Sequence, residues 1–493
     1  APSRRPSEFH VHDAIVIGGG ASGLACAHAL DREGVDVVCL EAGSQAGGVI
    51  QTAREGEFLF EDGPNTIQAS ARTFRTVCGE LGIADRLRLS SPSAAQRWLY
   101  LNGTLRALPT GLRSLLTNPI LSKRARLRIL TEPLRRFRRV GGDIEEPTLG
   151  EFLESRLGHE AARNIGGAFV RGVYAAELDE LGARSAFPRL WDACNEHGGL
   201  IRGMLATARA RKQAPPAPGP IGTKDQLLSF DDGLGELIHG FEDRLGARIR
   251  RNAPVVELSR GPGGFQVTLE SGETLSSPSV VMAVPAREAH PLLSLASPDR
   301  TNLDPLFRVA HASVVVVHLG LDLAELPAGF GFLVPPTESG VAGAPKLLGA
   351  LFGSQIFSGR APDRGATVSC IYRAADVTQH DDTGLLEQAI HDLRLALGRS
   401  PGVVKVSRVR RWDDVIPRYG VGHARRMEAL RHSVQRALPG LVPCGNFMGG
   451  VSVDDRLTEG RKAAAEVLAA VQHKRAQPLP AKAAPTQPEE PAR

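Results

Sequence analysis

The most regular pattern of apolar and polar positions lies near the start of the chain. An apolar run, Ala14–Ile17, ends in glycines and is followed by a helix-like stretch to Leu30. A second apolar run, Val35–Leu40, follows and ends in Glu41. Because buried parallel strands form short, continuous apolar runs, this succession predicts a strand–helix–strand unit. The fold class expected from it is α/β with a parallel sheet.

Later regions show the alternation that is typical of half-buried strands. Residues 248–269 predict a β-meander, which the apolar run Val280–Pro285 closes. Residues 301–411 alternate apolar strands with loops and predict a mixed sheet. Near the end of the chain, Leu441–Pro443 precedes a glycine turn and a long helix.

Turn and cap residues place shorter elements between these regions. Arg97–Pro109 is predicted to form a hairpin that turns at Asn102-Gly103, so that Arg97 and Leu99 share a face. Thr148 and Glu151 have the spacing of a capping box and predict the start of a helical lobe. The proline-rich stretch after that lobe is expected to be a linker.

Length and charge extend this picture. With 493 residues, the chain is long enough for several lobes. Its net charge is +5, and the basic residues gather between residues 111 and 139, where Glu132 is the only acid. Leucine and isoleucine interleave with these cations, which favours amphipathic helices on an anionic bilayer, although an ordinary cationic surface remains an alternative. Nucleic acid is not expected as a partner, because the stretch lacks base-stacking aromatics.

The cysteines and apolar runs bear on the compartment. The six cysteines contain no CxxC pair and several fall in apolar patterns, so they are expected to be reduced and structural, in an intracellular protein. No apolar run is long enough to span a bilayer, and the first residues lack the apolar core of a signal peptide.

The glycines after the first strand carry the clearest chemistry. Gly18, Gly20 and Gly23 have the GxGxxG spacing, which allows a tight turn, close approach to a pyrophosphate and close packing of helix on strand. Glu41 lies where a ribose hydroxyl needs an acceptor. The pair Gly47-Gly48 suits close approach to another portion of such a cofactor. The turn at Gly63-Pro64-Asn65 suits either a flavin ring or a plain surface turn.

In this order, these motifs resemble the FAD-dependent amine oxidase superfamily and, within it, the protoporphyrinogen oxidase family. The resemblance runs through most of the chain. It is carried by Asp62–Asn65, Gln96–Tyr100, Arg171–Ala175, Phe187-Pro188, Ser229–Leu234, Gly329–Pro335, Leu348–Phe352 and Ile416–Tyr419. Ser452 and the pair Gly449-Gly450 depart from the commonest family pattern.

The resemblance implies an FAD-binding Rossmann-like domain of the glutathione-reductase and amine-oxidase type, built from discontinuous segments. A mixed-sheet substrate domain and an α-helical membrane-binding domain accompany it. Three segments are expected to build the FAD-binding domain, at 9–90, 225–300 and 412–474. The other expected regions are a disordered leader (1–8), a substrate and helical membrane-binding lobe (91–212), a linker (213–224), a substrate-binding lobe (301–411) and a disordered tail (475–493).

The residues expected to contact FAD combine the glycine motifs with positions that the resemblance supplies. They are Gly18, Gly20, Ala21, Ser22, Gly23, Glu41, Ala42, Gly47, Gly48, Val49, Gly63, Pro64, Asn65, Val255, Val256, Gly450, Val451 and Val453. The two valines at 255 and 256 have a core role as the alternative. The residues that the resemblance places against substrate are Arg97, Gly172, Leu333 and Phe352, with Gly172 leaving room for a flat macrocycle. A core role is the alternative for Leu333 and Phe352. Arg97 would pair with a propionate, for which a guanidinium is suited.

The reaction that the resemblance implies is oxidation of protoporphyrinogen IX to protoporphyrin IX, with hydride passing from a porphyrinogen carbon to FAD. Dioxygen would be the acceptor and hydrogen peroxide the by-product, within heme biosynthesis. The resemblance also implies peripheral attachment to an anionic membrane, at the cytoplasmic face of the inner membrane or in the cytoplasm, and allows a homodimer.

Several alternatives stay open at this point. The flavin chemistry fits coproporphyrinogen III, a carotenoid precursor or an amine as substrate, although few tyrosines and tryptophans are present for an amine-binding cage. Other classes are a non-catalytic tetrapyrrole carrier and a nicotinamide dehydrogenase, which would not need the segment Gly445–Asp455. Neither a catalytic proton acceptor nor a metal site is identified; the proton could pass to a carboxylate, water or a substrate nitrogen.

Overall fold

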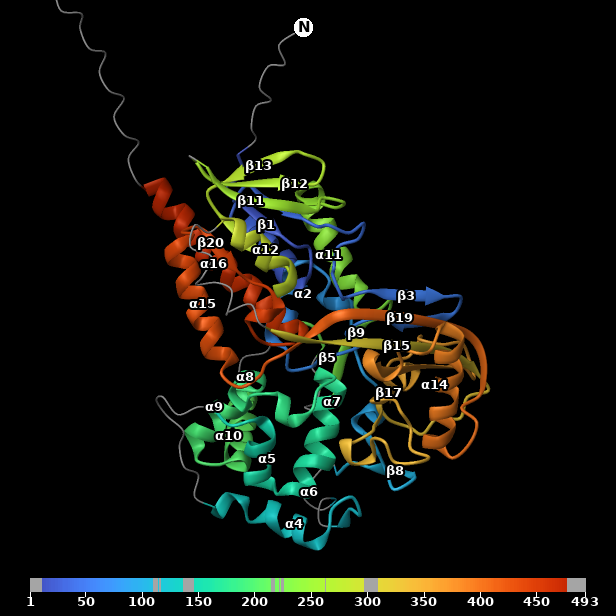
Figure 1. Ribbon diagram of the computed structural model, residues 1–493. Helices are drawn as coiled ribbons and strands as arrows, with labels where there is room; N and C mark the ends of the chain where they lie inside the picture. The colour runs from blue at the N-terminus through green and yellow to red at the C-terminus, as the bar shows by residue number, and fades with distance from the viewer. Residues whose placement is uncertain are drawn as a thin grey trace, which may run out of the picture.

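The computed structural model describes residues 11–109, 114, 117–135, 146–213, 218–220, 222, 226–261, 263–296 and 309–476. A parallel sheet with its helices, a mixed sheet and a group of further helices occupy different regions of the molecule (Figure 1). The expected leader, the tail from residue 477 and most of the linker lie outside the described residues. Much of the basic stretch, at 110–113, 115–116 and 136–139, also lies outside them.

The parallel sheet joins strands from the beginning, middle and end of the chain. In spatial order they are β10 (Ile249–Arg250), β2 (Val37–Leu40), β1 (Ala14–Ile17), β14 (Val280–Met282) and β20 (Leu441–Pro443), each parallel to its neighbour. The prediction of an α/β fold assembled from discontinuous segments is therefore confirmed.

Both faces of this sheet are covered, which explains its continuous apolar strands. On β1, Ala14 and Val16 pack in one core, and Ile15 and Ile17 pack in the other. The first core contains α1 (Ala21–Arg32), α2 (Arg72–Glu80), α11 (Gly235–Leu245) and α16 (Val453–Ala476). The second contains β11 (Val255–Gly261), β12 (Gly264–Leu269), β13 (Thr274–Ser277), α12 (Ala286–Ala296) and α15 (His423–Ala437).

The predicted meander is smaller than the sequence pattern indicates. It consists of the three antiparallel strands β11, β12 and β13, whereas the runs at 249–250 and 280–282 belong to the parallel sheet. The burial patterns explain the difference. β12 alternates between buried and half-buried residues, but β14 is buried throughout, as a strand covered on both faces must be.

The mixed sheet joins the predicted hairpin to the region 301–418. Its order is β19 (Val403–Arg418), β15 (Ala310–Asp322), β18 (Ala366–Arg373), β17 (Gly349–Leu351), β16 (Gly331–Leu333), β7 (Trp98–Leu101) and β8 (Thr104–Ala107). β7 and β8 pair in antiparallel register around Asn102 and Gly103, both with positive φ, which confirms the predicted turn. One face of this sheet is covered by α14 (Asp382–Leu397).

Short strands and a short helix lie between the two large sheets. β3 (Thr52–Glu55) and β4 (Phe58–Glu61) form a hairpin, and β5 (Ile67–Gln68), β9 (Leu227–Phe230) and β6 (Leu87–Leu89) form a second small sheet. α13 (Gly353–Ile356) follows β17. The β3–β4 hairpin leads directly into the turn at Gly63, which makes it a component of the site described below.

Helices make up the third region of the molecule, with α4 at its lower end (Figure 1). They are α4 (Lys123–Leu130), α5 (Leu149–Leu157), α6 (His159–Ala161), a π-helical segment (Ala162–Gly167), α7 (Ala168–Tyr174), α8 (Ala183–Ala186), α9 (Pro188–His197) and α10 (Leu200–Gln213). The capping box is confirmed, because Thr148 Oγ1 accepts from Glu151 N and the Glu151 side chain accepts from Thr148 N. Among the described helices, none combines the length and apolar character needed to cross a bilayer.

All six cysteines are buried and free, as expected. Burial raises the pKa of Cys39 and Cys444 to about 12, so both stay protonated at neutral pH. Cys39 and Cys444 are core residues of the parallel-sheet region.

Candidate cofactor and substrate site

The glycines between β1 and α1 differ in what surrounds them. A Cβ on Gly23 would lie 1.9 Å from the Gly18 carbonyl oxygen, so close packing of α1 on the turn requires glycine there. At Gly20, by contrast, no described atom lies within 4 Å of the Cβ position. Gly20 therefore leaves open space at the N-terminus of α1. Among the described residues no side chain caps this helix, so its first amides face that space without a side-chain acceptor.

Glu41 holds the turn and the end of β2 together. Its Oε2 accepts from Gly19 N at 2.9 Å, and its Oε1 accepts from Gly43 N at 2.7 Å. A carboxylate at this place suits a ribose hydroxyl, since each oxygen keeps a further lone pair. Three features therefore suit these residues to a dinucleotide. They are the open space at Gly20, the N-terminus of α1 and the Glu41 carboxylate at the end of β2.

The predicted valines of β11 lie just after a residue that hydrogen-bonds to the main chain of Glu41. Glu41 O accepts from Ala253 N at 2.9 Å, which places Val255 and Val256 close by in the chain. The β11–β12 register shifts between Val255 and Glu257, so Val256 has no partner in that ladder. Val256 is half exposed, and Val255 packs against the core. This bulge leaves the backbone of Val256 outside the ladder, where it could meet a ligand, as the expected contact with FAD requires.

Two further loops pack backbone against backbone beside the turn. Gly47 bridges to Gly20, and Gly47 N donates to Gly19 O at 2.8 Å. A Cβ on Gly63 would lie 1.9 Å from Val49 O. The structure therefore brings the Gly47–Val49 and Gly63–Asn65 loops into one continuous surface with Gly20.

The C-terminal loop reaches this surface through α16. Ser452 Oγ accepts from Asp455 N at 3.1 Å and caps the helix. Gly450 has φ +75, and Tyr419 Oη donates to its carbonyl at 3.2 Å. α16 then packs on α1 so tightly that a Cβ on Gly460 would lie 2.1 Å from Ser22 O. The helix that begins after Gly450 and the helix that begins after Gly20 are thus in direct contact.

Two of the four residues expected to bind substrate, Arg97 and Leu333, share one face of the mixed sheet, and a third, Gly172, packs against that face from α7. Leu333 pairs with Leu99 between β16 and β7, and alternation places Arg97 on the Leu99 side. A Cβ on Gly172 of α7 would lie 2.6 Å from Leu333 Cδ2. The Arg97 guanidinium carbon lies 5.2 Å from the centre of the Phe330 ring, within cation–π range.

Phe352 lies away from the other three residues expected to bind substrate. Its side chain is 0% exposed and packs with Phe332 in the core that α14 covers, on the face opposite Leu333. The reason lies in the strand period. Phe352 follows β17 in phase with Ala350, which pairs with Phe332, so its side chain points away from Gly172.

The sequence reasoning missed a buried charged group before Gly63. Asp62 is 1% exposed and pairs with Arg408, whose Nη2 donates to Oδ2 at 2.8 Å and whose Nε donates to Oδ1 at 3.1 Å. His318, 0% exposed, lies 3.3 Å away through Nε2. Burial opposes ionisation of Asp62, but its contacts with His318 and Arg408 outweigh burial and lower its pKa to about 2. The sequence carries one signal for this group, which is His318 within the apolar run of its strand.

The neighbouring carboxyl group behaves in the opposite way. Burial raises the pKa of Glu61 to about 7, against the opposing influence of Arg360 and of bonds from Thr52 Oγ1 and Leu234 N. Its Oε1 accepts from Leu234 N just before α11, and its Oε2 accepts from Thr52 Oγ1 on β3, so Glu61 joins β4 to that helix and to the neighbouring strand. Glu61 is a carboxyl that can exchange a proton near neutral pH.

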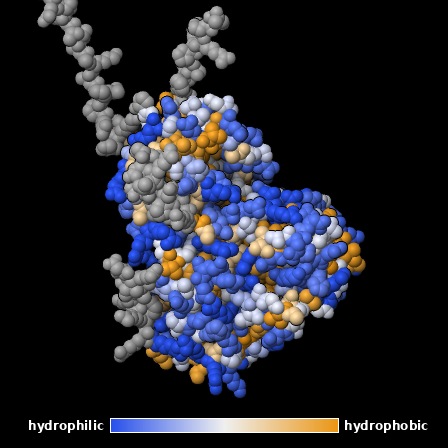
Figure 2. All heavy atoms as spheres, in the orientation of Figure 1, coloured by the Kyte–Doolittle hydropathy of each residue, from blue (hydrophilic) through white to orange (hydrophobic). Residues whose placement is uncertain are grey.

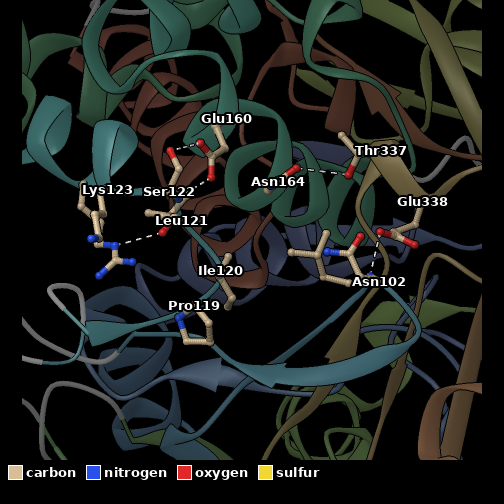
Figure 3. A pocket seen from close by; sticks show the side chains of 12 residues that line it. Asn102, Pro119, Ile120, Leu121, Ser122, Lys123, Glu160, Asn164, Thr337 and Glu338 are labelled. Atoms are coloured by element: carbon tan, nitrogen blue, oxygen red, sulfur yellow. Dashed lines mark hydrogen bonds between the residues drawn. The ribbon is translucent and has the colours of Figure 1, made fainter.

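A separate open depression of about 740 Å³ lies near α4 (Figure 3). Ser122 and Glu160 hydrogen-bond on one side of it, and Glu338 accepts from Asn102 N at 3.0 Å on the other. None of Arg97, Gly172, Leu333 and Phe352 lines it. The depression is therefore distinct from the face that carries the expected substrate residues.

Comparison with known proteins identifies the class. The profile of the family described as flavin containing amine oxidoreductase matches residues 21–468, so the chain belongs to this family. FAD is accordingly its cofactor, and the chain is an FAD-dependent oxidoreductase.

Individual relatives agree with this class over nearly the full chain. Human protoporphyrinogen oxidase is 32% identical over 92% of this chain and 98% of its own length. Coproporphyrinogen III oxidase of Bacillus subtilis is 24% identical over 92% and 97%. A solved structure from Exiguobacterium, named by inference as a protoporphyrinogen oxidase, has a TM-score of 0.75 at 23% identity and covers 93% of this chain and 98% of its own. At that identity the structural likeness shows the fold.

Proposed function

We propose that this protein oxidises protoporphyrinogen IX to protoporphyrin IX, with FAD as cofactor, dioxygen as acceptor and hydrogen peroxide as by-product. The observation that carries the proposal is the similarity to human protoporphyrinogen oxidase, since it covers 92% of this chain and 98% of that protein. The expectation drawn from the sequence motifs is the same.

In this function the chain supplies binding and orientation, and FAD when bound supplies the redox chemistry. The open space at Gly20 and the amides of α1 would receive the pyrophosphate, and Glu41 a ribose hydroxyl. The packed loops at Gly47–Val49 and Gly63–Asn65 would hold the flavin end. The N-terminus of α16, after Gly450, would aim its positive dipole at charge that develops on the flavin.

The substrate would lie on the face that carries Arg97 and Leu333. Arg97 would bind a propionate, and Leu333 would pack against the apolar macrocycle. Gly172 supports this arrangement, because a Cβ there would lie 2.6 Å from Leu333 Cδ2 and would displace the end of the Leu333 side chain. Gly172 would thus leave room for the Leu333 side chain as well as for the macrocycle.

Coproporphyrinogen III, which carries more propionates, is the second candidate substrate, because a coproporphyrinogen III oxidase is among the relatives. Cations near α7 favour the first candidate. Arg171, 5% exposed, and Arg373 both pair with Glu177, at 3.1 and 2.8 Å. Two guanidinium groups already joined to a carboxylate are less suited to extra propionates.

We also propose that α4 and its surroundings contact an anionic membrane surface. Leu127 and Leu134 are 62% and 81% exposed among arginines. Glu132, the acid of this stretch, is fully buried against Arg156 and Leu200 N, so its charge does not offset the basic surface. Figure 2 shows hydrophobic and strongly hydrophilic atoms together at the lower end of the molecule, where Figure 1 places α4. This combination suits the interface of an anionic bilayer.

The decisive experiment uses the purified protein. Its visible spectrum should show bound flavin, and addition of protoporphyrinogen IX under air should give fluorescent porphyrin faster than a heat-inactivated sample. Parallel assays with coproporphyrinogen III rank the two substrates. A flavin-containing protein that oxidises neither porphyrinogen would contradict the proposed substrate class.

A further inference from the structure

The carboxylate, the main-chain amide and the main-chain carbonyl of Asp62 each have a hydrogen-bond partner. Its carboxylate accepts both hydrogen bonds of the Arg408 fork and faces His318. Its amide donates to Gln51 O at 2.9 Å, and its carbonyl accepts from Trp412 Nε1 at 2.7 Å. A residue held in this way cannot shift without breaking several buried contacts.

The partners of Asp62 come from the mixed sheet. His318 lies on β15, whereas Arg408 and Trp412 lie on β19, and these two strands run side by side across the middle of the molecule (Figure 1). His318 Nδ1 shares a hydrogen bond of 2.8 Å with Ser369 Oγ on β18. The Arg410 guanidinium stacks 4.0 Å over the Trp412 ring and donates to Gln51 Oε1. The mixed sheet thereby positions the segment on both sides of Asp62.

The next residue transmits this position to the expected flavin loops. Gly63 follows Asp62, and its Cβ position lies 1.9 Å from Val49 O. The Gly47–Val49 and Gly63–Asn65 loops therefore move together, and Asp62 fixes the place of both. Its carboxylate is ionised at neutral pH, so a negative and a positive charge lie side by side directly behind these loops.

We propose that the pair formed by the buried Asp62 and the partly exposed Arg408, with His318 beside it, positions the two flavin loops and sets the reduction potential of the bound flavin. The inference rests on the proposed assignment of those loops to the flavin. Asp62 and Arg408 are positioning residues, because each acts on the flavin through the loop and through its charge. A charge near a cofactor in a low-dielectric site changes the stability of its electron-rich state.

The two charges predict opposite shifts, which separates this role from a structural one. Asp62→Asn removes the negative charge and should raise the flavin potential, whereas Arg408→Gln leaves the carboxylate unpaired and should lower it. Both variants should weaken FAD binding, by about tenfold or more, since each releases the loops. If the pair were only structural, both substitutions would change the potential in the same direction or leave it unchanged.

The measurements are the midpoint potential of the holoprotein by spectrophotometric titration and FAD affinity by flavin fluorescence. Arg411→Gln is the matched control, because Arg411 lies on the same strand and pairs with Asp382 at the surface; it should change neither quantity. Arg408→Lys keeps the charge and should restore most of the potential but little of the affinity. If Asp62→Asn fails to fold, the two Arg408 variants carry the test. The midpoint potential should then fall in Arg408→Gln and stay near that of the wild type in Arg408→Lys.

The outcomes distinguish this inference from the proposed function. A wild-type protein that shows no flavin spectrum or oxidises no porphyrinogen contradicts the function. A wild-type protein that does both, with potentials unchanged in the Asp62 and Arg408 variants, contradicts only the inference.

Discussion

At the scale of single residues, two glycines of one motif have opposite roles, which leads to the first prediction. Gly20→Ala places a methyl group in space that no described atom fills, so the apoprotein should keep its stability. The same methyl group would occupy the pyrophosphate cradle, and FAD affinity should fall at least about tenfold. Gly23→Ala should instead destabilise the fold by roughly 2 kcal/mol or more, because its Cβ would lie 1.9 Å from Gly18 O.

Urea unfolding of the apoprotein and FAD titration measure these two effects separately. Gly263→Ala serves as a control for glycine replacement in open space, because no described atom lies within 4 Å of its Cβ position and its φ is not positive. Equal loss of stability in the Gly20 and Gly23 variants would show that Gly20 is a packing residue and not a cradle.

Arg97 carries the second prediction at this scale. Arg97→Ala removes the proposed partner of a propionate and should raise KM about tenfold to a hundredfold, since a charge-assisted bond is worth roughly 1.5–3 kcal/mol. Turnover should change less, because the propionate lies away from the reacting carbon. Steady-state kinetics with protoporphyrinogen check this, with Arg97→Lys expected to recover some of the affinity. Unchanged kinetics would remove Arg97 from the site.

At the scale of elements, structural features that depend on neighbouring residues could be predicted from the sequence. Features that depend on pairing between distant segments could not. The capping box at Thr148 and the turn at Asn102-Gly103 depend on neighbouring residues, and the structure confirms both. The face of Phe352 depends on the phase of β17 against β16, which no local pattern defines. Likewise, the bond between Asp62 and Arg408 joins segments far apart in the chain, and although His318 signals a buried polar group, a single sequence does not show which residues pair there.

Helix α4 gives the prediction that belongs to this scale. Replacing Leu127 and Leu134 together by serine removes two exposed apolar side chains, each worth about 1.5–3 kcal/mol when buried. Flotation with anionic vesicles should therefore fall at least about tenfold, and wild-type flotation should decrease in high salt. Val403→Ser, a similarly exposed position on β19, should float like the wild type. Failure of the wild type to float at any salt concentration would contradict membrane contact.

At the scale of the whole molecule, contacts between α15 and the residues that follow it support the C-terminal loop, which we propose contacts the flavin. His423 on α15 is 2% exposed, and its Nε2 donates to Phe447 O at 2.7 Å, just before Gly450. Its ring also lies 4.7 Å from that of Tyr419, which binds the Gly450 carbonyl. A neutral imidazole therefore helps to support the C-terminal loop.

Burial lowers the pKa of His423 to about 4, although its bond to Phe447 opposes that shift. The unfolded chain binds this proton near its ordinary pKa of 6.5, whereas the folded chain does not. The contribution of His423 to stability is thus present above pH 6.5 and is lost as the pH falls towards 4. At about 1.4 kcal/mol per pKa unit, the loss is roughly 3 kcal/mol.

The fourth prediction follows from this linkage. The free energy of unfolding of the wild type should fall between pH 6.5 and 4 by roughly 3 kcal/mol more than that of His423→Gln, which has no imidazole to protonate. Because Phe447 leads into the Gly450 loop, FAD should also be released at a higher pH from the wild type than from the variant. His432→Gln, an exposed position on the same helix, should retain the wild-type pH dependence. Parallel pH profiles for wild type and His423→Gln would show that acid sensitivity arises elsewhere.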